Sequence, residues 1–179
     1  GAKERTLHRT EDVLATLSMI RQHKLDVRTV TMGIDLAPCS SPDVTVLCDR
    51  IRTRLVHYAG RLRSVCREVE DRYGIPIVNR RIAVSPIGRI AAGQKAEGLL
   101  TVARTLDEVA AEVGVDLVGG FTALVQKGWT DSERRLIAAL PEVLSTTSRV
   151  CSSVNVGSTA AGINMDAVAA LGHVLKETA

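Results

Sequence analysis

Short β-prone segments alternate with longer helical segments along most of the chain, and this alternation constrains the fold more than any other feature. The β-prone segments cover residues 27–36, 77–84, 115–118 continuing at 121–125, and 150–156. The segments between them are long enough to cross a sheet as helices, which is what parallel strands require of their connections. The sequence therefore predicts an α/β fold built from parallel βαβ units.

Apolar residues recur three and four positions apart in the intervening segments, as they do on the buried face of a helix. We expect helices over 10–23, 41–73, 87–92, 97–113 and 131–146, and from about 165 onwards. Gly74 and Gly114 are placed to end two of these helices, and Pro141 predicts a kink inside another or its division into two shorter helices. The helix over 41–73 is the longest expected element, with an apolar face that runs from Val44 to Val69.

The core of this fold must be aliphatic, because the 179 residues include one Phe, one Trp and two Tyr. Val, Ile, Leu and Ala suit parallel strands that helices cover on both faces. A chain of this length is expected to form a single domain over residues 1–179. Its abrupt ends, Gly1 without Met and Ala179 without a capping glycine, suggest a fragment or one chain of a split protein.

The charge pattern disfavours nucleic acid as a partner. The formal net charge is only +3, and basic residues such as Arg61 and Arg63 are interspersed with acids such as Glu68 and Glu70. A nucleic-acid interface normally concentrates cations and interleaves aromatic residues for stacking. We therefore expect no nucleic-acid partner and interpret the charges as a solvated helix face.

The cysteine spacing and the hydropathy pattern favour a cytoplasmic protein with reduced thiols. Cys39, Cys48, Cys66 and Cys151 form no CxxC pair or Cys/His cluster, so we expect no metal site. The sequence contains no recognisable signal peptide, and no apolar run approaches the roughly 20 residues that span a membrane. We expect no membrane association, and the sequence names no cofactor.

The segment from Cys151 to Met165 is the richest candidate for chemistry, because it joins a predicted strand to a predicted helix through a small-residue loop. Glycines allow backbone N–H groups to converge there, and a helix N-terminus adds partial positive charge. Such a loop can hold a carboxylate or a phosphate at the carboxyl end of a strand; an ordinary strand-to-helix turn is the alternative. The candidate ligand-binding residues are Ser152, Ser153, Asn155, Gly157, Ser158, Thr159 and Asn164.

Two further places are candidates for anion binding. Adjacent Gly119 and Gly120 predict a bulge or a close backbone approach in a loop at a strand end, and Lys127 follows shortly after. Arg80 and Arg81 lie inside a β-prone segment, so alternation points them to opposite faces of the sheet. At least one of them is expected to face the interior, where a charge needs a partner; a strand end dipping into solvent is the alternative.

Cys151 is the one candidate catalytic residue, as a nucleophile or a radical carrier. A thiol in a strand also serves as a small apolar side chain, and no His neighbours Cys151 in the sequence.

Five blocks of the sequence together resemble a known family. They are DVRTVTMGI at 26–34, GIPIVNRR at 74–81, GVD at 114–116 with GGFTALVQKG at 119–128, VCSSVNVGST at 150–159, and GINM at 162–165. In order and spacing they resemble the family often labelled "PFL family protein", which is related by fold to pyruvate formate-lyase and has no known function. The resemblance covers almost all of the chain.

The resemblance implies an α/β barrel of about ten strands with helices outside. This chain would supply the N-terminal portion, about half of that barrel, and a homo-oligomer or a second chain would complete it. The resemblance also suggests a small ACT-domain protein as a partner. Fold kinship does not transfer a reaction. The leading hypothesis is an enzyme, or former enzyme, that binds a small anionic metabolite at the barrel centre, and the alternative is a regulatory or binding module.

Overall fold

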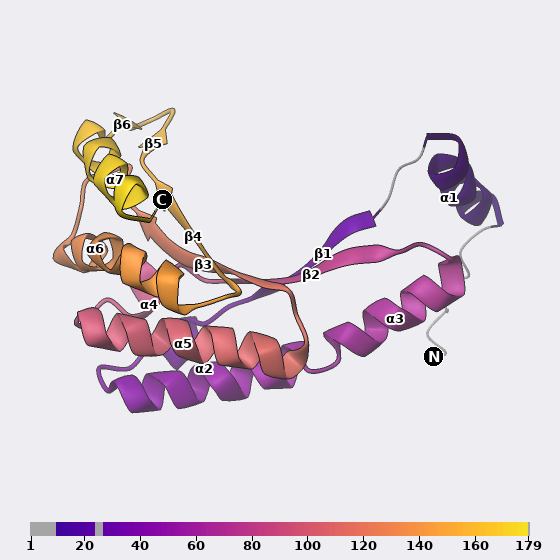
Figure 1. Cartoon of the computed structure of the whole chain (residues 1–179), viewed down its shortest axis with the longest axis horizontal. Helices are drawn as coiled ribbons and strands as arrows, with labels where there is room; N and C mark the ends of the chain where they lie inside the picture. Colours follow the sequence, from indigo (N-terminus) through magenta and orange to yellow (C-terminus); the bar gives the residue numbers. More distant parts are fainter. Residues whose placement is uncertain (1–9, 24–26, 179) are drawn as a thin grey trace, which may run out of the picture.

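Four parallel strands form one sheet at the centre of the molecule (Figure 1). The computed structural model describes residues 10–23 and 27–178. The strands are β1 (Val27–Ile34), β2 (Ile77–Val84), β3 (Leu117–Leu124) and β4 (Val150–Asn155). They lie side by side in chain order, and each pairs in parallel with the next. The predicted mixed α/β architecture with parallel βαβ units is confirmed.

Helices lie before, between and after the strands. They are α1 (Thr10–His23), the 3-10 helix η1 (Ala37–Cys39), α2 (Val44–Ala59), α3 (Leu62–Tyr73), α4 (Ile87–Ile90), α5 (Ala96–Val113), α6 (Asp131–Thr146) and α7 (Met165–Thr178). A small antiparallel hairpin of β5 (Gly157–Ser158) and β6 (Gly162–Ile163) lies between β4 and α7. α6 passes through Pro141 as one helix.

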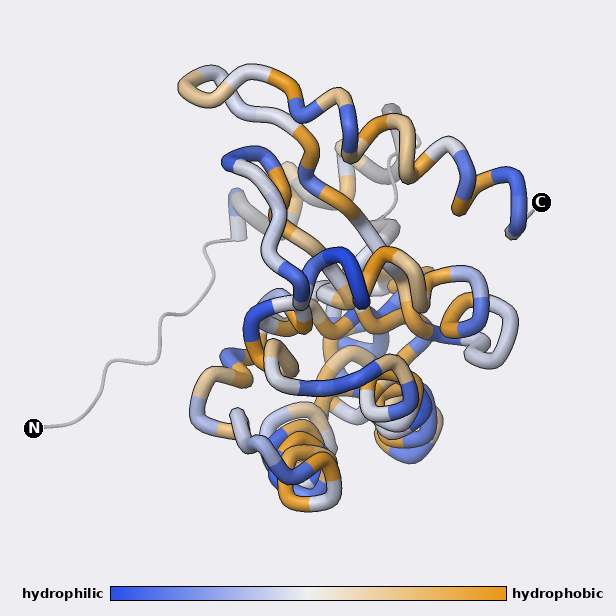
Figure 2. Tube along the Cα trace, turned by 90° about the vertical axis from the view of Figure 1, so that its left-hand side faces the viewer, coloured by the Kyte–Doolittle hydropathy of each residue, from blue (hydrophilic) through white to orange (hydrophobic). Residues whose placement is uncertain are grey.

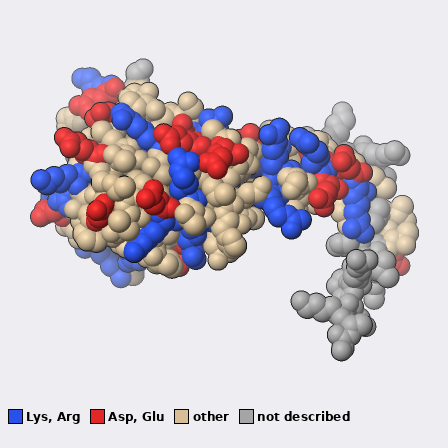
Figure 3. All heavy atoms as spheres, turned by 90° about the horizontal axis from the view of Figure 1, so that it is seen from below, with Lys and Arg blue, Asp and Glu red and all other residues tan. Residues whose placement is uncertain are grey.

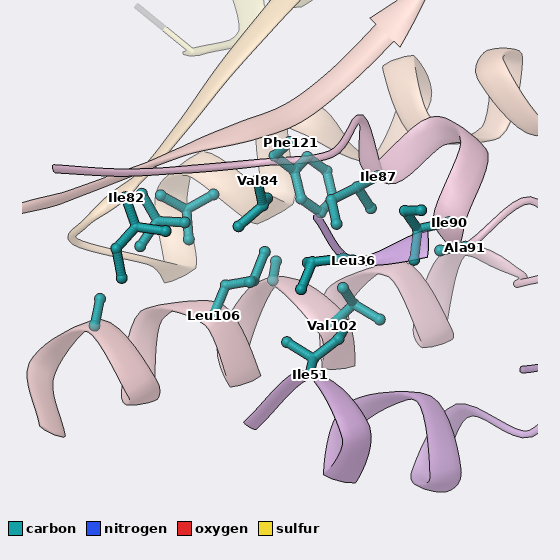
Figure 4. Packing of buried hydrophobic residues seen from close by; sticks show 14 of the residues in the cluster. Leu36, Ile51, Ile82, Val84, Ile87, Ile90, Ala91, Val102, Leu106 and Phe121 are labelled. Atoms are coloured by element: carbon teal, nitrogen blue, oxygen red, sulfur yellow. The ribbon is translucent and has the colours of Figure 1, made fainter. Parts of the chain in front are cut away.

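The hydrophobic core lies between the sheet and the helices on one of its faces. In Figure 1, α2, α4, α5 and α6 all lie below the strands, and Figure 2 shows α2 and α5 nearly end-on, each carrying hydrophobic and hydrophilic residues. Leu36, Ile82, Val84 and Phe121 point down into the layer formed by the helices (Figure 4). Burying one such aliphatic or aromatic side chain contributes about 1.5–3 kcal/mol, so this layer stabilises the fold.

The opposite face of the sheet is not covered by helices within the described residues. Along β1 the buried Ile34 and the half-buried Val30 and Met32 alternate with the exposed Thr29 and Thr31. The expectation that helices dry both faces is wrong for this part of the chain. The alternation of apolar and polar residues along each strand explains the result, because it leaves only one face apolar enough to bury.

The long helix expected over 41–73 is two helices, because the chain turns at Gly60 and Arg61. Arg61 has φ −100° and ψ −2°, outside regular helix geometry. A Cβ on Gly60 would lie 2.6 Å from the Val56 carbonyl oxygen, so this turn needs glycine. The turn also changes which side of the helix is buried. Tyr58 and Val65, which belong to the apolar face expected from Val44 to Val69, are 49% and 43% exposed.

β3 is one continuous strand, where the sequence predicted two pieces separated by a glycine loop. The predicted bulge is confirmed, since the pairing with β4 shifts between Gly119 and Phe121. Gly120 has φ +120°, and a Cβ there would lie 2.5 Å from the Val84 carbonyl oxygen. The bulge brings the backbones of β2 and β3 together where only glycine fits.

The outer surface of the helix layer carries both signs of charge. Figure 3, viewed from below, shows Lys and Arg side chains interspersed with Asp and Glu. Arg52 on α2 illustrates the pattern, because it forms ion pairs of 2.7 Å with both Glu108 and Glu112 on α5. Among the helices described, none combines the length and the apolar character that a membrane span requires.

Candidate functional site

A row of small residues crosses the uncovered face of the sheet. Strand register places Gly33, Ala83, Gly119 and Cys151 side by side on β1, β2, β3 and β4. A Cβ on Gly33 would meet no atom within 4 Å, and one on Gly119 would meet only the Ile82 oxygen at 3.9 Å. The space next to Gly33 and Gly119 is therefore open, and we call this row of small residues the trough. We call the trough and its flanking residues Thr31, Arg81, Thr122 and Ser153 the open face.

Arg81 is the cation of the open face. It pairs in register with Thr31 on one side and Leu117 on the other, one step along the strands from the trough. Its side chain is exposed, and no described residue forms a hydrogen bond or an ion pair with it. A guanidinium presents a planar fork of donors that matches carboxylate and phosphate oxygens. Arg81 is thus available to an anion above the sheet.

Arg80, by contrast, points to the other side of the sheet and is bonded within the chain. Its Nε lies 3.3 Å from Oδ2 of Asp116, and its backbone N–H donates to the same oxygen at 2.7 Å. The predicted need of one of the two arginines for a partner is met by this carboxylate. Because its charge is already paired with Asp116, Arg80 is not part of the open face.

Hydroxyl groups border the trough on the side away from Arg81. The Thr122 and Ser153 hydroxyls, paired across β3 and β4, are hydrogen-bonded at 2.8 Å. At the end of β1 and β2, the Ser85 hydroxyl donates to Asp35 Oδ1 at 2.7 Å. Hydrogen bonds from the Ala37 N–H and the Ser85 hydroxyl hold the pKa of Asp35 below its usual value, with the charge of Arg54 acting in the same direction.

Cys151 closes the trough at β4. It is half-buried, and its Sγ lies 3.9 Å from the Arg149 carbonyl oxygen. Burial raises the pKa of Cys39, Cys48 and Cys66, so those three thiols are poor sources of thiolate. Cys151 is therefore the thiol best placed for contact with a molecule on the open face, and its catalytic role stays a prediction.

The segment 157–162, expected to be a loop of convergent N–H groups, contains the β5–β6 hairpin. Gly157 and Ser158 pair with Ile163 and Gly162, and the Ala161 N–H donates to the Ser158 hydroxyl. Asn155 accepts a hydrogen bond from the Gly157 N–H at 3.4 Å, and Thr159 is exposed at the tip. Ser152 faces the core side and donates to the Phe121 carbonyl. These residues are not gathered around one point.

A second hollow lies where β3 and β4 end. We call it the rim pocket, a cavity of about 670 Å³ lined by Gln126, Lys127, Gly128, Trp129, Ala160, Ala161, Ile163, Asn164 and Asp166. Asn164 joins its walls: Nδ2 donates to the Val125 carbonyl at 2.9 Å, and Oδ1 accepts from the Ala167 N–H at the start of α7. The predicted Lys127 and Asn164 therefore share a pocket, whereas Arg81 lies elsewhere.

Several residues of these two places were missed by sequence reasoning. Ser85 and Gln126 directly follow β-prone segments, so their positions at the carboxyl edge were a usable signal, whereas Asp35 fell inside the segment 27–36. Asp166 resembled an ordinary first-turn acid. Within residues 10–23 and 27–178, no three His, Cys, Asp or Glu side chains gather in a way that would hold a metal ion.

Comparisons with known proteins place the chain among proteins of unknown function. The profile of a family described as "Uncharacterised ACR (DUF711)" matches residues 18–179. The chain is 50% identical over 169 residues to a "UPF0210 protein" of Desulforudis audaxviator and 48% identical to one of Syntrophotalea carbinolica. Each match covers 94% of the chain but 37% of the relative, so the chain spans little more than a third of these relatives' length.

Proposed function

The chain belongs to the uncharacterised DUF711 family, whose curated relatives are named UPF0210 proteins, and we propose that its open face binds a small anionic metabolite, a carboxylate or a phosphate. The protein would then be an enzyme or former enzyme. The observation that carries the proposal is Arg81, an exposed guanidinium in the middle of a sheet without a partner among the described residues. A ligand of opposite charge can form charge-assisted hydrogen bonds with such a guanidinium.

The residues around Arg81 suit an anion of small size. Gly33, Ala83 and Gly119 leave a trough beside the guanidinium that larger side chains would fill. Thr31 adds a hydroxyl beside Arg81, its register partner on β2, and the Thr122 and Ser153 hydroxyls lie across the trough. Hydroxyls donate to carboxylate and phosphate oxygens without competing for the cation.

The open face also fits the barrel that the resemblance to pyruvate formate-lyase implies, which stays a prediction. If further strands continue the sheet around a barrel, the helices lie outside and the open face lines the interior. Arg81 and the hydroxyls would then lie in a site sheltered from water, where charge pairing is stronger. The predicted ten-stranded barrel would explain why this face of the sheet carries polar residues.

Thermal unfolding of the purified protein with inorganic phosphate, pyruvate and phosphoenolpyruvate tests the proposal. A ligand at a hundred times its Kd adds about 2.7 kcal/mol of stability, which raises the Tm. Arg81→Met and Gly119→Val should abolish this rise, the first by removing the charge and the second by filling the trough. Arg104→Met, an exposed arginine on α5, is the matched control. An equal rise in wild type and Arg81→Met would refute the site.

A second candidate function, a regulatory or binding module acting through a protein partner, is favoured by the sheet edges. β1 and β4 are the outer strands of the sheet, and no described strand pairs with their outer edges. Unpaired edges readily accept a strand from another chain. The partner can be a second copy of this chain, a chain that completes the barrel, or the small ACT-domain protein suggested by the resemblance.

Light scattering and hydrogen exchange distinguish this second candidate. An assembly that covers the edges would protect the outward-facing amides of β1 and β4 to the same degree as those of β2 and β3. A monodisperse monomer whose edge amides exchange rapidly would contradict it, while leaving the open face as the site.

A further inference from the structure

The rim pocket carries two opposite charges that no described residue neutralises. Lys127, in the connection from β3 to α6, and Asp166, in the first turn of α7, both line the pocket and are both exposed. Neither side chain forms an ion pair or a hydrogen bond with a described residue, although both border the same cavity. The pocket thus offers one cationic and one anionic partner to a ligand.

An unused hydrogen-bond acceptor lies in the same wall. Oε1 of Gln126 is buried and has no hydrogen-bond partner. Leaving such a group unpaired is unfavourable, and the terminal amide of a glutamine rotates over a broad range. A ligand that brings an N–H donor into the pocket therefore allows this amide to turn and gain a bond that the free protein lacks.

The remaining lining of the rim pocket includes apolar side chains and a tryptophan that an arginine contacts. Ile163 is 67% exposed on the hairpin, and Ala160 and Ala161 lie beside it. Trp129 also lines the pocket, with the Arg134 guanidinium 4.5 Å from its ring centre. Exposed aliphatic surface next to a half-buried tryptophan is where an apolar side chain of a ligand gains most from leaving water.

From these contacts we infer that the rim pocket binds a free α-amino acid with an apolar side chain. Lys127 pairs with the ligand carboxylate, and Asp166 and the Gln126 oxygen accept from its ammonium group. Ile163 and Trp129 cover its side chain. A plain carboxylate is disfavoured by the Asp166 charge, and a plain amine is disfavoured by Lys127. A zwitterion satisfies both, and a cavity of about 670 Å³ has room for it.

The inference is independent of the anion site on the open face, because it uses none of the same residues. Its ligand class also differs, since the open face lacks an acid in register with Arg81 whereas the rim pocket pairs a base with an acid. A substitution can therefore abolish ligand binding at one site without affecting the other.

Isothermal titration calorimetry with three matched probes tests the inference. They are L-leucine, 4-methylpentanoate, which lacks the ammonium group, and 3-methylbutylamine, which lacks the carboxylate. We expect leucine to bind and each analogue to bind at least about tenfold more weakly, as the loss of a charged hydrogen bond implies. Binding of 4-methylpentanoate as tight as that of leucine would overturn the zwitterion assignment, and so would the absence of leucine binding at about 10 mM.

Matched variants locate the binding. Lys127→Met and Asp166→Asn should each weaken leucine binding at least about tenfold. Asp131→Asn, which neutralises a first-turn acid on α6, and Lys176→Met at the other end of α7 are the controls. All four side chains are exposed, so circular dichroism should show native folding in each. Equal weakening in the controls would overturn the assignment to this pocket. Arg81→Met should keep leucine binding, which separates this test from that of the open face.

Discussion

The carboxylate of Asp116 accepts two hydrogen bonds from Arg80, one from the backbone N–H at 2.7 Å and one from the guanidinium Nε at 3.3 Å. The Asp116 N–H donates in return to the Arg80 carbonyl at 2.9 Å. The Asp116 side chain thus accepts the Arg80 N–H in place of a backbone carbonyl just before β3 begins. These bonds set the position at which β3 starts to pair with β2.

Asp116→Ala should therefore lower the free energy of unfolding by about 1–3 kcal/mol, because it leaves the Arg80 N–H without a partner. Asp116→Asn should be milder, since its side-chain oxygen can still accept from that N–H. Urea unfolding measures both. If Asp116→Ala proves as stable as the wild type, the carboxylate has no part in setting the strand.

Gly120→Ala should destabilise the protein by about 1–3 kcal/mol, since it forces a Cβ toward Val84 at a positive φ. The neighbouring Gly119→Ala is the control, because its new methyl group faces the trough with its nearest atom 3.9 Å away. The two variants differ by one position and carry the same substitution. Equal melting temperatures would show that the bulge tolerates a side chain.

The pH dependence of stability should reveal Asp35. Its pKa in the folded protein lies below the ordinary value of 3.8, because Ala37 and Ser85 donate hydrogen bonds to the charged form. The ionised form is therefore the stabilising one, fully so above pH 3.8 and progressively less as pH falls through the folded-state pKa. Asp35→Asn should lower the Tm at pH 7, and this difference should shrink below about pH 3.8. A difference that grows on acidification would contradict the assignment.

Alkylation should discriminate among the thiols. Cys39, Cys48 and Cys66 are buried and have raised pKa values, so iodoacetamide should modify them only after unfolding. Cys151, half-buried on the open face, should react first in the native protein. Peptide mass spectrometry reports the order. Early modification of Cys66 would show that α3 opens readily.

Much of the fold was predictable because it follows from local sequence patterns, such as β-prone segments and paired glycines. The four β-prone segments became the four strands, and the glycine pair at 119–120 became the bulge. The break at Gly60 was missed, because apolar residues continue at helical spacing on both sides of it. The spacing of apolar residues does not show that the buried face changes direction at Gly60. The usable signal was a glycine inside a helical segment.

The candidate site was less predictable, because it depends on strand register. Alternation separated Arg80 from Arg81 but did not show which of them meets Asp116, a residue 36 positions away. The row formed by Gly33, Ala83, Gly119 and Cys151 exists only once four strands are aligned. The presence of Lys127 and Asp166 in the lining of one pocket likewise depends on the path of the chain through the β5–β6 hairpin.

The agreement between strand order and chain order has a consequence for biosynthesis. Each strand pairs with the one synthesised before it, so a chain leaving the ribosome always adds to an edge that already exists. Each newly synthesised strand can pair at once with the strand made immediately before it. We expect arrest-peptide force profiles to rise stepwise as β2, β3 and β4 emerge in turn, whereas a single late rise would mean that the sheet assembles only when all four strands are free.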